Sequence, residues 1–429
     1  MRLLNKTVCA LLALPAMATF CAAQQAPLRL TLDDAIQRGI KANLSGVIAG
    51  TRVAEAGGTT ERRLSALLPH ARAEFDPRLQ AQSLRAQGIT VPQLPPVVGP
   101  FATYDFRVYA DQSLIDLQSY HLWKSSQREQ DAAREDYQSV RDDLVRLIAG
   151  YYLNAEYAAA RVEAAKQRVK TSEALYRLAM DQHSAGLATA VDELRAQVQM
   201  TTDQQNLVVV QNAQKLALID LARNIGLTPG TPLELADTLD FRAAAPLDVD
   251  SEIGASLARR ADYQSLARQR DALLEQQKAN HSRNLPRLTL AGNFGGIGRT
   301  FGSVDRTGAI GASLSFTLFD RDRGGESKQL ASQLARLDAQ MADMRLGIEQ
   351  DIREAALTLD SAAQETTIAN SALELAEREL TLAQDRFRSG VTDNIEVVQA
   401  QDSVSRALEN RILALSRHAD AKAALARAL

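Results

Sequence analysis

The sequence has little cysteine, and both cysteines lie near the start of the chain. Among 429 residues only Cys9 and Cys21 are cysteine, and both fall within residues 1–23, which have the form of a secretory signal peptide. Cleavage after Ala23 would leave a mature chain with no disulfide and no thiolate metal site. A lipoprotein would carry a small residue directly before Cys21, where this chain has Phe20, so we expect no lipid there.

The chain also lacks the residue clusters on which enzymes and metalloproteins depend. Its five histidines are scattered, and none forms a His-x-x-x-His pair or a glutamate-spaced zinc motif. The segment Gly295 to Gly298 is rich in glycine like a phosphate-binding loop, but it is predicted to lie between two strands, so a hairpin turn explains it better. Acidic and basic residues are interleaved and the formal net charge is −3, which argues against a nucleic-acid partner. We expect no enzyme activity, no metal and no cofactor.

Long apolar runs are missing, and so is proline from much of the chain. No segment after residue 23 holds eighteen consecutive apolar residues, so the sequence predicts no membrane-spanning helix. All twelve prolines lie outside two tracts, 101–228 and 287–429. Because proline inside a helix costs about 3 kcal/mol, these tracts are where long helices can form. Apolar residues from Leu330 to Ile352 recur every three or four positions, as in packed coiled-coil helices.

What the chain contains instead is an internal repeat with a constant offset of 204 residues. The segment Ser113 to Asp116 (SLID) returns as Thr317 to Asp320 (TLFD), and Ala185 to Leu187 (AGL) returns as Ser389 to Val391 (SGV). A fixed period of this kind predicts two copies of one structural unit.

Each copy is predicted to contain one long helix and two shorter ones. At about 1.5 Å per residue, a helix over 114–183 is roughly 105 Å long, and two short helices stacked end to end match it. We expect a bend at Gly57 and Gly58, because adjacent glycines weaken a helix. The six expected helices are 32–67, 114–183 and 190–224 in the first copy, and 252–284, 325–388 and 394–425 in the second.

Between the short and long helices, apolar and polar residues alternate with a period of two. This pattern predicts four strands of about ten residues in two hairpins, at about 70–112 and 287–319. Seven of the ten phenylalanines fall in these hairpins or their loops, as in the aromatic girdles of outer-membrane barrels. The polar faces carry Arg72, Glu74, Asp76, Arg78, Asp105 and Arg107.

Four such strands cannot close a barrel, because single-chain barrels begin at eight strands and open edges leave backbone groups unpaired in lipid. The sequence therefore predicts an oligomer, and three copies would supply twelve strands. The alternative is a soluble periplasmic protein with both hairpins packed on its helices. The charged faces argue against it, because a small dry core could not hold those side chains unpaired.

Several segments carry a family resemblance. Thr31 to Ile36 (TLDDAI) opens the first helix, Leu67 to Pro69 (LLP) and Asn284 to Pro286 (NLP) enter the hairpins, and two helix-turn-helix tips follow. In this order the chain resembles the TolC-type outer membrane efflux protein family over essentially its whole mature length. The predicted organisation is a signal peptide at 1–23, a first repeat at 24–227, an equatorial linker at 228–250 and a second repeat at 251–429.

The resemblance implies a mainly α fold with a β-barrel segment. It implies a homotrimer with a twelve-strand barrel in lipid of the cell outer membrane and a twelve-helix tunnel in the periplasm. Such channels are passive ducts of tripartite efflux or type I secretion systems, and work with a periplasmic adaptor and an inner-membrane pump of the RND or ABC type. The cargo (drug, metal, metabolite or protein) and the pump class stay open.

A periplasmic adaptor protein is the alternative function, because adaptors also carry long coiled-coil hairpins. They usually have one hairpin beside small β domains, whereas this chain predicts two hairpin copies and four amphipathic strands. A periplasmic enzyme, the third class, has no sequence feature in its favour.

The resemblance also implies two kinds of functional residue at the tips. Adaptor docking is expected at Gly186, Leu187, Thr189, Gly390, Val391 and Thr392. The alternative is a plain turn between helices, in which Gly186 and Gly390 only supply a positive φ.

A gate is expected just past the tips, where family members narrow the tunnel with acidic side chains. The corresponding residues are Asp192 in the first copy, and Glu396 and Gln399 in the second. Family members with a tightly closed gate have two aspartates at the second tip, so this chain keeps only one of the two charges, at Glu396. A tyrosine and an arginine that hold some family gates closed correspond to Phe387 and Thr392, which cannot form those bonds, and Arg388 is the candidate substitute. The alternative is an ordinary solvated helix face.

Overall fold

The computed structural model describes residues 27–89, 92, 95–186, 188–245, 247–389, 391 and 394–429. The predicted signal peptide and three predicted tip residues, Leu187, Gly390 and Thr392, lie outside the described residues. The elements in chain order are β1 (Leu28–Leu30), α1 (Leu32–Ala42), α2 (Leu44–Ser65), β2 (His70–Ser83), η1 (Arg85–Gln87), β3 (Val97–Ile115), α3 (Leu117–Ser184), α4 (Ala190–Asn224), β4 (Leu233–Leu235), α5 (Val249–Arg259), α6 (Ala261–His281), η2 (Ser282–Asn284), β5 (Arg287–Gly298), β6 (Val304–Ser315), α7 (Asp322–Arg388) and α8 (Asn394–Ala428).

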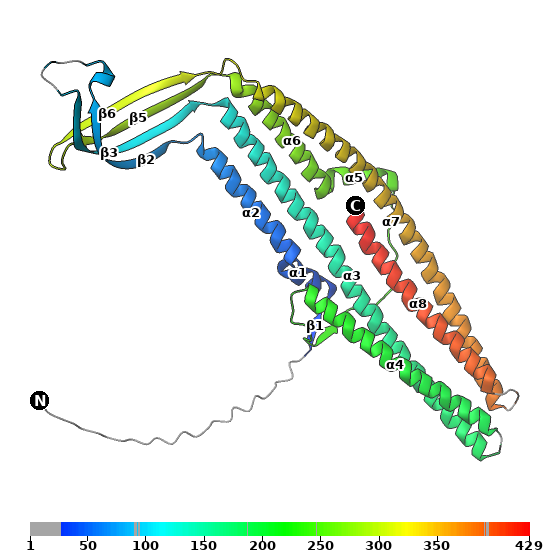
Figure 1. The fold of residues 1–429 in the computed structure, drawn as a ribbon. Helices are drawn as coiled ribbons and strands as arrows, with labels where there is room; N and C mark the ends of the chain where they lie inside the picture. Colours follow the sequence, from blue (N-terminus) through cyan, green and yellow to red (C-terminus); the bar gives the residue numbers. More distant parts are fainter. Residues whose placement is uncertain are drawn as a thin grey trace, which may run out of the picture.

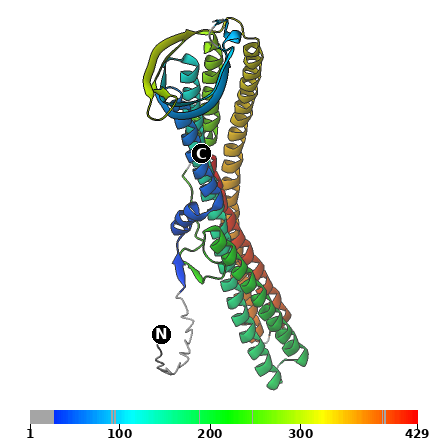
Figure 2. The same ribbon diagram turned by 60° about the vertical axis from the view of Figure 1, so that its left-hand side comes forward.

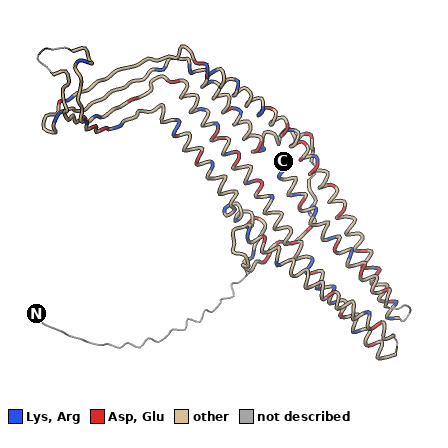
Figure 3. The backbone as a smooth tube through the Cα atoms, viewed as in Figure 1, with Lys and Arg blue, Asp and Glu red and all other residues tan. Residues whose placement is uncertain are grey.

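The helices form a tall slab of four columns, with the sheet at one end (Figure 1). The 68 residues of α3 and the 67 of α7 correspond to about 100 Å each. Along α3, α2 and α4 follow one another on one side and α6 and α8 on the other, and α7 packs on α6 and α8. The expected match between one long helix and two short ones is therefore confirmed. Basic and acidic residues are interleaved along the helices (Figure 3).

The expected bend at Gly57 and Gly58 is wrong. Both glycines lie inside the continuous helix α2, and the break falls at Asn43, between α1 and α2. Asn43 has an extended backbone, and its side-chain Oδ1 accepts a hydrogen bond from the Ser45 amide at 3.0 Å, so it caps the start of α2. The short helix expected at 252–284 is likewise interrupted, at Arg260, where the backbone is extended between α5 and α6.

The two hairpins join into one antiparallel sheet of four strands, in the order β2-β3-β5-β6. Cross-strand partners such as Phe75 and Phe106, or Val108 and Phe294, put apolar side chains on one face. On the other face, Arg107 contacts Asp105 at 2.8 Å and donates to the Asn293 Oδ1 atom at 3.2 Å. Figure 2 shows that the sheet is strongly curved. Strands β2 and β6 are its free edges, and β2 contains Pro77, a residue tolerated at a sheet edge.

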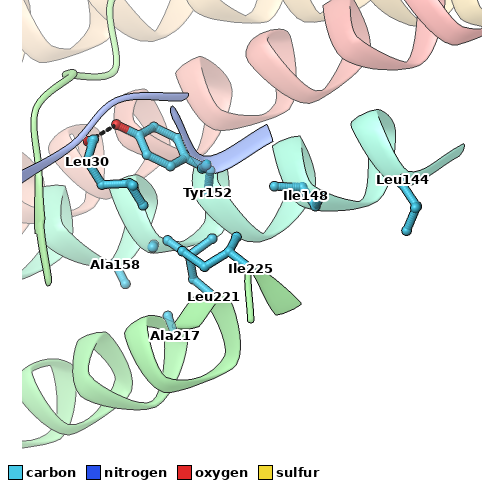
Figure 4. Packing of buried hydrophobic residues seen from close by; sticks show 10 residues of the cluster. Leu30, Leu144, Ile148, Tyr152, Ala158, Ala217, Leu221 and Ile225 are labelled. Carbon is cyan, nitrogen blue, oxygen red and sulfur yellow. Dashed lines mark hydrogen bonds between the residues drawn. The ribbon is translucent and has the colours of Figure 1, made fainter. Parts of the chain in front are cut away.

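A buried cluster near the middle of α3 packs this helix against β1, α1 and α4 (Figure 4). Its centre is Tyr152 on α3, which is 1% exposed and whose hydroxyl donates to the Leu30 carbonyl at 3.0 Å or to Asp237 Oδ2 at 2.8 Å. Leu30 belongs to β1, which pairs in parallel with β4, a contact that the sequence did not predict. The remaining buried members are Ala35, Leu144, Ile148, Ala155, Ala158, Ala217, Leu221 and Ile225. We call this level of the molecule the belt. Among the described residues, no helix combines the length and hydropathy of a membrane span.

Gly39 on α1 gives a direct test of the belt packing. A Cβ atom at this position would lie 2.1 Å from the Cδ1 atom of Ile148, which is fully buried. We expect Gly39→Ala to destabilise the protein by about 1–3 kcal/mol, as overpacking does in other cores. In Gly254→Ala, the control on α5, the new Cβ has no neighbour within 4 Å, and helix propensity predicts a gain of roughly 0.5–1 kcal/mol. Thermal unfolding followed by circular dichroism measures both, and an unchanged melting temperature for Gly39→Ala would contradict the packing argument.

Candidate docking tips and gate

The first tip is a tight turn between α3 and α4. The Ala185 amide donates to the Asp181 carbonyl at 3.0 Å, and the Gly186 amide donates to the His183 carbonyl at the same distance. Gly186 has a φ of 72°, and a Cβ there would have no neighbour within 4 Å, so the backbone conformation and not space favours glycine. Leu187, the apolar residue expected at the point of this tip, lies outside the described residues.

The start of α4 is fixed by a reciprocal capping box. The Thr189 amide donates to Asp192 Oδ2 at 3.1 Å, and the Asp192 amide donates to Thr189 Oγ1 at 3.4 Å. Hydrogen bonds from Thr189 lower the pKa of the Asp192 carboxyl, and Arg195 acts in the same direction. Thr189, predicted for docking, and Asp192, predicted for the gate, are thus in direct contact, and they stabilise the start of α4.

The second tip repeats the turn at the end of α7. The Ser389 amide donates to the Asp385 carbonyl at 3.0 Å, and the Val391 amide donates to the Arg386 carbonyl at 3.0 Å. The Val391 side chain is 67% exposed, so this tip presents an apolar side chain at the end of the molecule. Gly390 and Thr392 lie outside the described residues.

The predicted gate residues of the second copy lie on the first turns of α8. Glu396 is half-buried, and its Oε1 atom accepts a hydrogen bond from Arg386 Nη1 at 2.8 Å. Gln399 is exposed one turn further on. Arg388, the predicted substitute, pairs with Asp385 on its own helix at 3.4 Å. The cation beside Glu396 is therefore Arg386, which sequence reasoning missed, because only the hairpin geometry brings residues ten positions apart into contact.

The two copies use different chemistry at the same position below the tips. In the second copy, Phe387 and Val397 are buried in an apolar cluster that also includes Leu175 of α3. At the offset of 204 residues, the first copy has His183 and Glu193, and the His183 Nδ1 and Glu193 Oε2 atoms are hydrogen-bonded at 2.6 Å. Aligning the two repeats would have revealed this exchange. Phe387, which cannot make the bonds of a gate tyrosine, is thus a packing residue.

Among the described residues, no cluster of three or more histidine, cysteine, aspartate or glutamate side chains is placed to hold a metal ion. The described features at the tips are a glycine turn at Gly186, the exposed side chain of Val391 and acidic residues on the first turns of α4 and α8. These features are suited to contacts with another protein and with passing ions, and they contain no reacting group.

The match to a protein family decides what kind of chain this is. The family model described as outer membrane efflux protein matches residues 70–227 and 253–429, which together are more than half of the chain. The chain belongs to the outer membrane efflux protein family. The resemblance seen in the sequence is thereby confirmed, and so are the mainly α fold class with its strand segment and the expected place of the protein in the cell outer membrane.

Two curated relatives support the assignment. The efflux protein is 24% identical over 313 residues to the pyoverdine export outer membrane protein OpmQ of Pseudomonas putida, and that match covers 71% of this chain and 65% of the relative. It is 26% identical over 288 residues to the outer membrane protein OprJ of Pseudomonas aeruginosa, covering 63% of this chain and 58% of the relative. The matches thus span less than two thirds of either relative.

The fold has solved counterparts. The structure of the outer membrane protein VceC of Vibrio cholerae superposes with a TM-score of 0.77 at 17% sequence identity, covering 92% of this chain and 95% of that one. The family model describes an outer membrane efflux protein, and both relatives are named as outer membrane proteins, which favours this assignment over a periplasmic adaptor or an enzyme.

Proposed function

We propose that the efflux protein is a passive homotrimeric export duct that docks a periplasmic adaptor and, through it, an inner-membrane pump of the RND or ABC type. One observation carries the proposal: both the sheet and the helical slab end in unpartnered edges. The proposal includes the division of the chain into two repeats, 24–227 and 251–429, around the linker 228–250. The name of the P. putida relative supports export as the direction of transport.

The sheet edges support closure by other copies. Strands β2 and β6 each have one free edge, and unpaired backbone groups cost several kcal/mol each in a bilayer, so β6 of one copy would pair with β2 of the next. Three copies would make the twelve-strand barrel. The apolar face suits contact with lipid, because Phe294, Ile310 and Leu314 are 66%, 81% and 62% exposed in one chain.

The helical edges support the same assembly. The outer column on one side is formed by α2 and α4, and on the other side by α7. Both edges carry exposed apolar side chains at helical spacing, which monomeric proteins rarely leave uncovered over such a length. These side chains are Val191, Leu194, Val198, Val208, Val209 and Leu216 on α4, and Leu346, Leu357, Ile368, Leu375 and Leu382 on α7. Contact between α4 of one copy and α7 of the next would cover both stripes and close a twelve-helix tunnel.

The tips provide the proposed contact with the adaptor. Gly186, Thr189 and Val391 lie in or beside the turns that follow α3 and α7, at the end of the slab that is distant from the sheet (Figure 1). The proposed docking surface also includes Leu187, Gly390 and Thr392, which lie outside the described residues. In the trimer, Asp192, Glu396 and Gln399 would surround the narrowest part of the tunnel near this end. The acidic ring would favour cations over anions. Arg386 would hold Glu396 in place, while Arg388 stays paired with Asp385.

The assembly predicts a specific disulfide between copies. Val198 is about 12 Å from the start of α4, and Leu382 is about 9 Å from the end of α7, so the two lie at similar heights above the tips. We expect Val198→Cys with Leu382→Cys to give covalently linked trimers under mild oxidation on a denaturing gel. In the control pair, Leu216→Cys with Leu382→Cys, the heights differ by about 30 Å, and no link is expected. Equal linking of both pairs, or of neither, would contradict the proposed contact.

The proposed docking role of the tips can be tested by cross-linking at Val391. A photo-crosslinking amino acid at Val391, which is 67% exposed, should capture a periplasmic adaptor in living cells, identified by mass spectrometry. The matched control is the same amino acid at Leu147, which is 45% exposed on α3 at belt height, where no adduct with an adaptor is expected. Adducts at Val391 that contain only other copies of this chain would remove the docking role.

The proposed gate can be tested by measuring how the substitution of Glu396 changes the ion preference of the trimer. Replacing Glu396 with Gln keeps the side-chain size and removes up to three charges near the axis of the trimer, so cation preference should fall and the conductance should change. Glu409→Gln is the control, because Glu409 is exposed on the same helix about 20 Å further from the tip. Single-channel recordings in planar bilayers measure both quantities. Unchanged conductance and selectivity in Glu396→Gln would exclude Glu396 from the constriction.

A further inference from the structure

The segment after β4 crosses the groove between α3 and α8 at the belt. We call residues 236–242 the strap. The chain leads from the β1–β4 pair through the strap toward α5 (Figure 1). Two cavities of about 640 and 610 Å³ adjoin the strap, and both are lined by Glu156, Asp237, Thr238 and Leu239. These volumes fall in the range of small-molecule sites in proteins.

Glu156 is the unusual residue of this site. It is 6% exposed, and its Oε1 atom has no hydrogen-bond partner among the described residues. A buried carboxylate without a partner is costly, so the side chain requires either a proton or a cation. Burial, together with the nearby carboxylates of Asp237 and Asp240, raises the pKa of Glu156 to about 7.

The surrounding groups favour a ligand that donates hydrogen bonds. Asp237 is held in position, because its Oδ2 atom accepts from the Leu32 amide at 2.9 Å and from the Tyr152 hydroxyl at 2.8 Å. His418 on α8 lines the cavity of about 610 Å³. It is 2% exposed, and its Nε2 atom has no partner among the described residues. Burial and the charge of Lys422 lower the pKa of His418, so at neutral pH its imidazole is uncharged and can accept a hydrogen bond.

Two basic side chains also line this cavity, Arg242 and Lys422. Lys422 donates to the Arg242 carbonyl at 3.4 Å, and its charge lowers the pKa of His418. The charges that shift the pKa of Glu156 belong to two carboxylates, Asp237 and Asp240. The part of the cavity around Glu156 is therefore negative. Since no ligand cluster for a metal ion is present in the described part of the chain, a cation that brings its own N–H donors fits better than a bare metal ion.

We propose that the cavity of about 610 Å³ beside the strap binds a small organic ammonium ion, whose N–H groups donate to Glu156 and Asp237. Its hydrocarbon part lies against Ile36, Leu153 and Leu239, which line the same cavity. An ammonium group offers up to three donors and no acceptor, so it can satisfy the unpartnered carboxylate and neutralise it at once. The site lies between helices of one chain, and it does not depend on the proposed export function or on trimer formation.

Calorimetric titration of the full chain in detergent with benzylamine tests the proposal. Benzyl alcohol has nearly the same shape and no charge, so we expect it to bind at least tenfold more weakly than benzylamine. Glu156→Gln retains the shape of the side chain and removes its charge, and should weaken benzylamine binding at least tenfold. Asp136→Asn, which changes an exposed carboxylate on the same helix α3, should leave the affinity unchanged.

Circular dichroism shows whether each variant is folded before the titration. If Glu156→Gln does not fold, Asp240→Asn replaces it, because Asp240 is an exposed strap residue whose charge acts on Glu156, and a loss of about threefold is expected there. The proposal is overturned if native protein does not bind benzylamine, if benzyl alcohol binds equally well, or if the folded Glu156 or Asp240 variant binds with native affinity.

Discussion

The hydrogen bonds that the sheet cannot make within one chain are the constraint on which the rest of this molecule depends. Strands β2 and β6 each leave one edge without a neighbour. Lipid offers no hydrogen bonds to such groups, so a membrane-embedded sheet of this kind has to be completed by other strands. The helical slab is open in the same sense, because α4 and α7 carry apolar side chains that no described residue of the chain covers. One repeated architecture thus leaves open edges in both the sheet and the slab.

The belt fixes the height of α1 and α4 against α3. Tyr152 links α3 to β1 and to the strap, and the small residues around it allow α1, α3 and α4 to approach closely. A long helix has little resistance to sliding along its neighbour, whereas a buried cluster with a directed hydrogen bond defines one height. The geometry of the tips, about 50 Å away along α3, follows from this fixed point.

The two copies differ in the side chains that pack below their tips. Below the second tip, Phe387 and Val397 pack in an apolar cluster, while His183 and Glu193 form a hydrogen bond at the matching position of the first copy. A partly exposed side-chain hydrogen bond competes with water and adds little net stability, whereas burial of apolar side chains contributes more. The second hairpin is therefore packed at its tip by burial of apolar surface, and the first relies more on its capping box.

Much of the fold was predictable because it depends on local patterns. The absence of proline and the spacing of apolar residues predicted α3 and α7 to within a few residues, and alternation predicted the four strands. Adjacent glycines, in contrast, suggested a bend at Gly57 and Gly58 that does not exist, because capping by Asn43 places the break elsewhere. The contact of Arg386 with Glu396 was missed, since it depends on how a hairpin closes and not on spacing along one helix.

The sequence by itself determined the two long helices, the four strands of the hairpins, the repeat and the face of each of these strands that is apolar, because these follow from periodicity and from backbone propensities. Only the tertiary structure decided the order β2-β3-β5-β6, the pairing of β1 with β4 and the burial of Glu156 under the strap. These features arise from contacts between segments that are distant in the chain, and the free energy of such contacts depends on distances that no local pattern encodes.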